Sequence, residues 1–60
     1  MFSKFTFTAT VTNDRTGTTK TETGTVVSTG KQRARTDAAN QVSSGDRDER
    51  VEVDDVRYSH

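Results

Sequence analysis

Apolar and polar residues alternate over residues 5–12, near the start of the chain. Phe5, Phe7, Ala9 and Val11 occupy odd positions and are separated by threonines. A period of two residues is typical of a strand that buries one face, and β-branched threonine suits the exposed face. The pattern therefore predicts a strand over residues 3–12.

The residues that follow predict a tight turn and a second strand. Asn13 to Gly17 places Asp14 at the first position of a type I turn and ends in a glycine suited to a left-handed conformation. We therefore expect a hairpin whose second strand covers residues 18–28. If Asp14 lies opposite Thr18, the register pairs Phe5 with Val27, Phe7 with Thr25, Ala9 with Thr23, Thr10 with Glu22, and Thr12 with Lys20.

The stretch TGTVVSTGKQRAR, residues 23–35, superficially resembles a phosphate-binding loop. A Walker A loop requires Gly, four residues, and then Gly-Lys-Ser/Thr. Here five residues separate Gly24 from Gly30, and the residue after the lysine is Gln32. Both the spacing and the last residue exclude the motif. The same letters fit a capping box in which Thr29 is the N-cap and Gln32 the third helical residue.

A helix is accordingly expected over residues 30–44. Ala34, Ala38 and Val42 recur every four residues, which is the spacing of one helix face. Small side chains on this face would let the helix lie close to a sheet. Gly45 is a natural C-terminal stop.

A third strand is expected over residues 49–58. Val51 and Val53 are at odd-numbered positions, whereas Val56 and Tyr58 are at even-numbered positions. In a regular strand the two pairs would therefore lie on opposite faces. A bulge at Asp54-Asp55 would bring all four to the same face. Without it, Val56 and Tyr58 would face outward, toward a partner.

These elements predict an α+β fold in which residues 1–60 form a single small ββαβ domain. A right-handed crossover from the second strand places the third strand beside the first. The expected sheet is antiparallel with three strands in the order 2-1-3, and one helix packs on one face.

The composition limits how large a core this fold can have. The chain has 60 residues, of which 27% are hydrophobic, with no Leu, Ile or Cys. A core this thin usually needs a further source of stability. Without cysteine or a zinc pattern, self-association or a bound partner remains as the source, and a marginal monomer is the alternative. We expect no cofactor and no metal.

Enzymatic chemistry is poorly supported by the sequence. The only histidine is His60, the last residue, so a Ser-His-Asp or Cys-His arrangement is disfavoured. Asp54 and Asp55 point to opposite faces of a regular strand and would not converge without the bulge. Asp46, Asp48 and His60 do not follow the EF-hand pattern. We therefore expect a protein that is not an enzyme.

The charges are balanced overall but unevenly distributed. Nine cations and nine anions give a net charge of zero, which argues against a general nucleic-acid coat. Lys31, Arg33 and Arg35 nevertheless lie at the start of the expected helix, where cations oppose the helix dipole. This cluster is a candidate site for phosphate, nucleic acid or an acidic protein. A solvated basic surface, or pairing with the acidic third strand, is the alternative.

The face of the sheet opposite the helix is a candidate interface. It is expected to carry a row of threonines on the first strand, beside even-numbered residues of the second strand. A second copy could pack on this face, or a partner could add a strand to the exposed edge. An ordinary hydrated face is the alternative. The candidate interface residues are Thr6, Thr8, Thr10, Thr12, Lys20, Glu22 and Val26.

The leading hypothesis is a small non-enzymatic protein-interaction module or accessory factor that forms a homodimer or binds a protein partner. The alternative is a nucleic-acid or anion-binding protein. The sequence contains no apolar run long enough to cross a membrane, and its first residues do not resemble a signal peptide. We expect no membrane partner and a cytoplasmic location. A phage or mobile-element accessory protein would suit such a chain.

Overall fold

The computed structural model describes residues 1–43, 45 and 47–59. Within these residues the chain forms, in order, strand β1 (Ser3–Asn13), strand β2 (Thr18–Ser28), helix α1 (Lys31–Val42) and strand β3 (Glu49–Tyr58). The strand bounds lie within one residue of the ranges expected from the sequence.

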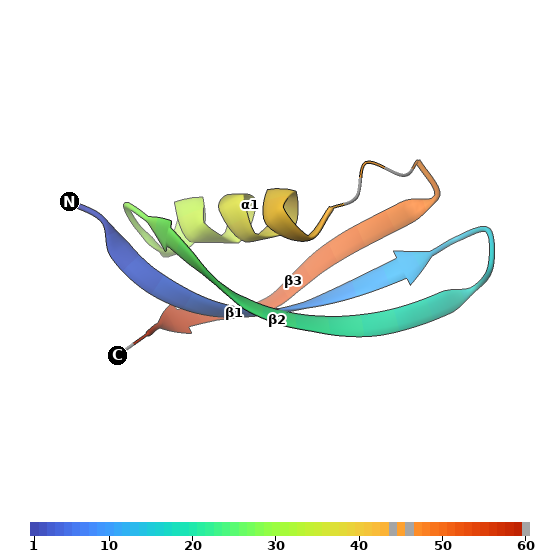
Figure 1. Ribbon diagram of the computed structural model, residues 1–60, viewed down its shortest axis with the longest axis horizontal. Helices are drawn as coiled ribbons and strands as arrows, with labels where there is room; N and C mark the ends of the chain where they lie inside the picture. Colours follow the sequence, from blue (N-terminus) through green and yellow to red (C-terminus); the bar gives the residue numbers. More distant parts are fainter. Residues whose placement is uncertain (44, 46, 60) are drawn as a thin grey trace.

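The three strands form one antiparallel sheet in the order β2-β1-β3. Helix α1 lies on one side of this sheet (Figure 1). The predicted fold class, an α+β arrangement with sheet order 2-1-3 and one helix on one face, is confirmed.

The helix is much shorter than the sheet that it covers. Its 12 residues span about 18 Å at the α-helical rise, whereas the 11 residues of β1 span about 36 Å when extended. Figure 1 shows α1 over one half of the sheet, with the tip of the β1–β2 hairpin projecting beyond it. One half of the helix-side face is therefore not covered by the helix.

The core lies between α1 and β1, the central strand. Phe5 and Phe7 are almost completely buried, with 0% and 2% of their surface exposed. Ala34 and Ala38 are the buried residues of the helix. Because alanine is small, the helix can approach the two phenylalanine rings closely. The cluster comprises Phe5, Phe7, Ala9, Val26, Ala34, Ala38, Val53 and Val56.

The hairpin register differs from the predicted register by one residue. Asn13 lies opposite Thr18, and Phe5 pairs with Val26 rather than Val27. A shift of one residue exchanges the two faces of a strand. Consequently Val26 joins the core on the helix side, and Thr25 moves to the open face.

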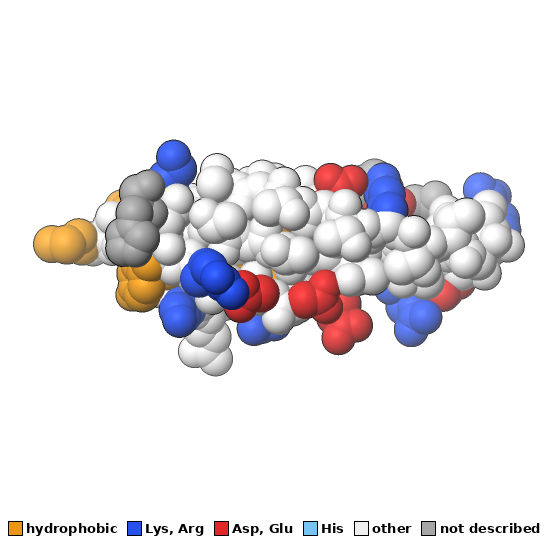
Figure 2. Space-filling model, turned by 90° about the horizontal axis from the view of Figure 1, so that it is seen from below, with side chains coloured by type: hydrophobic (Ala, Val, Ile, Leu, Met, Phe, Trp, Pro, Cys, Tyr) orange, Lys and Arg blue, Asp and Glu red, His pale blue; other side chains and the backbone are white. Residues whose placement is uncertain are grey.

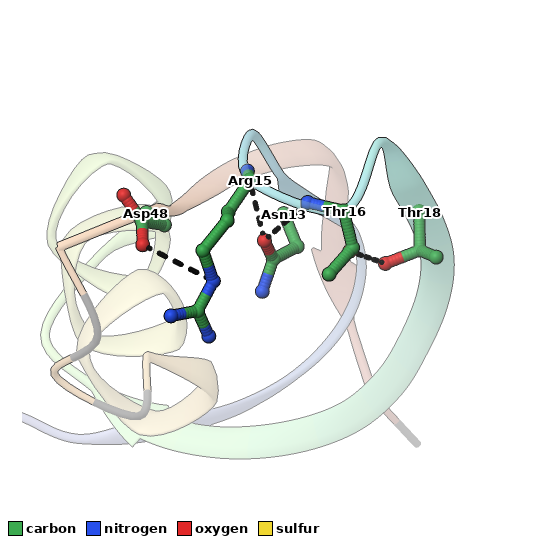
Figure 3. Close-up of polar contacts among 5 residues, drawn as sticks. All are labelled: Asn13, Arg15, Thr16, Thr18 and Asp48. Atoms are coloured by element: carbon green, nitrogen blue, oxygen red, sulfur yellow. Dashed lines mark hydrogen bonds and ion pairs between the residues drawn. The ribbon is translucent and has the colours of Figure 1, made fainter.

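Asn13 is the cause of this difference. Its side-chain Oδ1 accepts hydrogen bonds from the backbone N–H groups of Arg15 (3.0 Å) and Thr16 (3.1 Å). Its carbonyl accepts a further bond from the N–H of Gly17 at 2.8 Å. The turn therefore begins at Asn13 rather than Asp14, and four residues form the loop (Figure 3). Gly17 has a φ of 74°, as the sequence predicted for a left-handed glycine.

Of the two arrangements left open for β3, the structure has the one with the bulge. Thr8 pairs with Asp55 and Ala9 pairs with Val53, so Asp54 is the extra residue. The bulge restores Val56 to the helix side, where 8% of its surface is exposed. Tyr58 is 56% exposed but packs on Phe5, with ring centroids 4.7 Å apart. Neither residue therefore faces the open side of the sheet.

The helix begins and ends differently from the expected range of 30–44. Gly30 is the N-cap in an extended conformation, and no side chain among the described residues makes a capping hydrogen bond. The predicted capping box with Thr29 and Gln32 is therefore wrong. Ser43 is the C-cap, and Gly45 follows with a φ of 83°. The predicted end, Ser44, lies outside the described residues.

The hairpin turn is fastened to the segment that leads into β3. The backbone N–H of Asp14 donates to the carbonyl of Asp48 at 2.7 Å. Arg15 forms an ion pair with Asp48 at 3.6 Å, which Figure 3 shows, and Arg50 contacts Asp14 at 3.1 Å. These contacts hold the projecting end of the hairpin against the start of β3.

Candidate interaction surface

The open face of the sheet carries two parallel rows of threonine side chains. The register places each threonine of β1 directly beside a threonine of β2. No described element covers this face, which is largely white in Figure 2 because its side chains are neither apolar nor charged. The four pairs are Thr6 with Thr25, Thr8 with Thr23, Thr10 with Thr21, and Thr12 with Thr19.

The third strand adds a charged row to the same face. Arg57, Asp55, Glu52 and Arg50 pair with the threonines of β1. Arg57 contacts Asp55 at 2.8 Å, and Thr10 donates its hydroxyl proton to Asp54 at 2.6 Å. The two adjacent aspartates therefore have separate partners and do not converge as a carboxylate pair.

The face has an apolar end. Val27 pairs with Lys4, which has the parity of the threonine row, and 62% of Val27 is exposed. Phe2 precedes the strand and is 71% exposed. Hydrophobic side chains gather at one end of the view in Figure 2. The open face thus combines threonine methyl groups, an apolar end and a charged margin.

Three residues predicted for this interface lie elsewhere. Val26 is 7% exposed and belongs to the core, whereas Lys20 and Glu22 lie on the helix side of β2. Lys20 and Glu22 form an ion pair with each other at 3.5 Å. The one-residue difference in register accounts for all three.

The second threonine row was missed by the sequence reasoning. Its signal is the alternation of threonine over positions 19–25, which matches the alternation on β1. Matching the two threonine patterns would have given the observed register. The residues in this row are Thr19, Thr21, Thr23 and Thr25.

The outer edge of β2 is open within the described part of the chain. β2 is a terminal strand of the sheet, so it pairs with β1 on one side only. Its 11 residues, Thr18–Ser28, contain only two charged side chains, Lys20 and Glu22. Natural edge strands are usually shorter, more charged or interrupted by proline. The edge therefore offers a long row of backbone donors and acceptors.

The three cations at the start of the helix are not brought together. Arg35 donates from Nη1 to the carbonyl of Val53, the residue before the bulge, at 2.5 Å. Lys31 lies over the ring of Tyr58, with Nζ 5.8 Å from the centroid. Arg33 instead lines a hollow of about 410 Å³ with Thr29, Gly30, Gln32 and Thr36.

A second hollow lies where the helix does not reach. It has a volume of about 190 Å³ and lies on the helix side, near the hairpin end. Its walls come from all three strands: Val11, Asn13, Thr18, Lys20 and Glu49.

The described residues show neither a metal-binding cluster nor a membrane-spanning helix. The described residues contain no group of three or more His, Cys, Asp or Glu side chains that could hold a metal ion. Asp46 and His60, considered above as metal ligands, lie outside the described residues. No helix in the described part of the chain is long and apolar enough to cross a membrane. No protein-family model, curated protein or solved structure gives a significant match to this chain.

Proposed function

We propose that this protein is a small non-enzymatic interaction module that self-associates through the part of its sheet that α1 leaves free. The observation that carries the proposal is the threonine face, four cross-strand threonine pairs with no described element over them. The open edge of β2 adjoins this face and belongs to the same surface.

The small core supports the proposal. Among the residues that the structure describes, nine hydrophobic ones are buried, and three of these are alanines, which bury little surface. A domain of about 60 residues buries only about 60% of the surface that its unfolded chain exposes. Association that covers the threonine methyl groups, Val27 and the strand edge would add to this burial and so stabilise the fold.

The chemistry of the face also favours binding over catalysis. Several of its charged groups are engaged with their neighbours, Arg57 with Asp55 and Asp54 with Thr10. Threonine offers methyl groups for packing and hydroxyl groups for hydrogen bonds to another protein. Such a surface suits contact with another protein surface.

Sedimentation equilibrium over a range of concentrations, at low and high salt, tests the proposal. We expect a concentration-dependent dimer that persists in high salt, because buried contacts are screened much less than exposed charges. A monomer at every concentration and salt would refute self-association.

A double variant tests whether the dimer contact is made through the threonine face. Thr8→Lys with Thr23→Lys places two like charges at a central cross-strand pair. A dimer packed through the threonine face would then dissociate, whereas a dimer joined only at the β2 edge would persist. Thr36→Lys, on the exposed side of the helix, is the matched control and should leave the dimer unchanged.

The anion-binding alternative has weaker support from the geometry. Arg35 is held by the Val53 carbonyl and Lys31 by the Tyr58 ring, so only Arg33 faces the hollow beside the helix start. This alternative predicts salt-dependent binding of inorganic phosphate or nucleic acid that is lost in Arg33→Ala.

A further inference from the structure

We propose that two copies of this chain pair through the outer edges of their β2 strands, antiparallel, in the register that places Lys20 of each copy opposite Glu22 of the other. This inference rests on the proposed function, because it specifies how the self-association is made. It names one partner, a second copy, and one alignment of the two edges.

The alignment follows from strand geometry and charge. In an antiparallel pair, residues whose backbone groups point outward must meet residues of the same kind. A two-fold axis relates the two copies. Their edges can therefore shift past each other only in steps of two residues, so that even-numbered residues pair with even-numbered ones and odd-numbered residues with odd-numbered ones. Lys20 and Glu22 have equal parity, so an axis through Thr21 pairs each lysine with a glutamate of the second copy.

The neighbouring alignments are disfavoured by the same two residues. One step in one direction places Lys20 opposite Lys20 of the second copy. One step in the other direction places Glu22 opposite Glu22. Like charges directly opposite each other destabilise an antiparallel pair, whereas opposite charges stabilise it. Of the alignments near the middle of this edge segment, only the one centred on Thr21 satisfies both charges.

The existing ion pair extends naturally into this arrangement. Lys20 Nζ already lies 3.5 Å from Glu22 Oε1 in the same chain, and their side chains are 65% and 44% exposed. Two such pairs across the axis form a ring of alternating charges, in which each lysine contacts two glutamates. The charges that protect a lone edge from random pairing therefore become the feature that selects one partner.

The segment that would pair is accessible. The alignment joins Thr18 to Gly24 of one copy with the same residues of the other. Most of this segment lies in the part of β2 near the hairpin, which projects beyond α1 in Figure 1, whereas its last residue, Gly24, lies near Gln41 of α1. The buried residues of β2, Val26 and Ser28, lie at the other end of the strand. The helix therefore does not stand in the path of the second copy.

This pairing would form one continuous sheet of six strands, three from each copy. The two threonine faces lie on the same side, because paired strands share their faces. Thr21 of one copy meets Thr21 of the other, and Thr19 meets Thr23. The open face of one chain thus becomes half of a surface twice as wide.

Charge exchange at the edge tests the alignment. Lys20→Glu and Glu22→Lys each place like charges opposite each other twice in the dimer. We expect each to raise the dimer dissociation constant about tenfold or more in low salt. The double variant carrying both changes restores opposite charges and should dimerise like the original chain. A mixture of the two single variants should form heterodimers in preference to either homodimer.

Matched controls separate this effect from a change in net charge. Arg33→Glu and Asp37→Lys make the same changes in charge on α1, away from both the β2 edge and the threonine face. Both should leave the dissociation constant within about twofold of the original chain.

Cysteine cross-linking tests the axis directly. The chain has no cysteine, so Thr21→Cys introduces a single thiol. At the axis the two Cα atoms would lie about 4.5–5.5 Å apart, within the range of a disulfide. Thr19→Cys and Thr23→Cys would each lie roughly 13 Å from the same residue of the second copy. Only Thr21→Cys should therefore form a rapid intermolecular disulfide.

The outcomes distinguish the two proposals. Loss of dimer in both single variants, with rescue in the double variant, supports the alignment. A dissociation constant that no charge exchange changes, or cross-linking that is equal at positions 21 and 23, overturns the alignment. Either result leaves self-association through the threonine face. An original chain that is monomeric throughout overturns both.

Discussion

Gly24 is the position where the close contact between β2 and the core can be tested most sharply. A Cβ atom built on Gly24 would lie 3.0 Å from Cζ and 3.1 Å from Cε1 of Phe7. Phe7 is 2% exposed, so its ring cannot turn aside without displacing other core residues. Gly24→Ala therefore overpacks the core.

The expected cost can be estimated from two opposing effects. Overpacking by a methyl group costs about 1–3 kcal/mol. Removing the conformational freedom of glycine from the unfolded chain returns about 0.5–1 kcal/mol. We expect a net decrease of about 1 kcal/mol in the free energy of unfolding. For a domain of this size, that corresponds to a decrease in Tm of about 4–8 °C.

A double-mutant cycle isolates the contact. Phe7→Leu removes the ring atoms that the new methyl group would meet. Urea unfolding at one fixed protein concentration should therefore show Gly24→Ala destabilising the original chain but neutral or stabilising beside Phe7→Leu. The same penalty in both backgrounds would refute the reasoning, because the cost would then arise from the strand and not from the ring.

Two further predictions concern buried polar groups. Ser28 is 2% exposed and its Oγ has no hydrogen-bond partner among the described residues, so Ser28→Ala should raise the free energy of unfolding by about 1 kcal/mol in urea titrations. A decrease of similar size would contradict this. Arg35→Met keeps the aliphatic packing but leaves the Val53 carbonyl without its donor, and should lower the free energy of unfolding by about 1–3 kcal/mol in thermal unfolding. Arg33→Met, at an exposed position, is the control, and an equal effect there would show that charge alone is responsible.

The sequence predicts the fold well because its periodicity is clear. The alternation on β1 leaves only one way to bury both phenylalanines. The change of parity between Val53 and Val56 similarly requires a bulge, which the structure has at Asp54. In both cases hydrophobic burial decides between two alternatives that differ by a whole face of the sheet.

The register of the hairpin was harder to predict because one side chain decides it. Turn statistics suit both Asn13 and Asp14 as the first residue of the turn. The hydrogen bonds from Arg15 and Thr16 to the Asn13 side chain select the longer loop. That choice moves Val26 into the core and fills the open face with the second row of threonines.

The candidate anion site shows a different limit of sequence reasoning. Lys31, Arg33 and Arg35 are neighbours in sequence, but successive residues of a helix project about 100° apart. Two of them therefore reach β3, where Tyr58 and the Val53 carbonyl hold them. Proximity along a helix does not imply a shared face unless the spacing is three or four residues.

The contact between the hairpin turn and the start of β3 has a consequence for the order of folding. β1 and β2 are joined by four residues, so the hairpin closes at little entropic cost, typically within microseconds. β3 joins β1 only after nearly the whole chain has been made compact, since Phe5 pairs with Tyr58. The hydrogen bond from the Asp14 N–H to the Asp48 carbonyl fixes the residue before β3 against the hairpin turn. We therefore expect the last step of folding to be the pairing of β3 with β1 in one register, from Glu49 toward Tyr58.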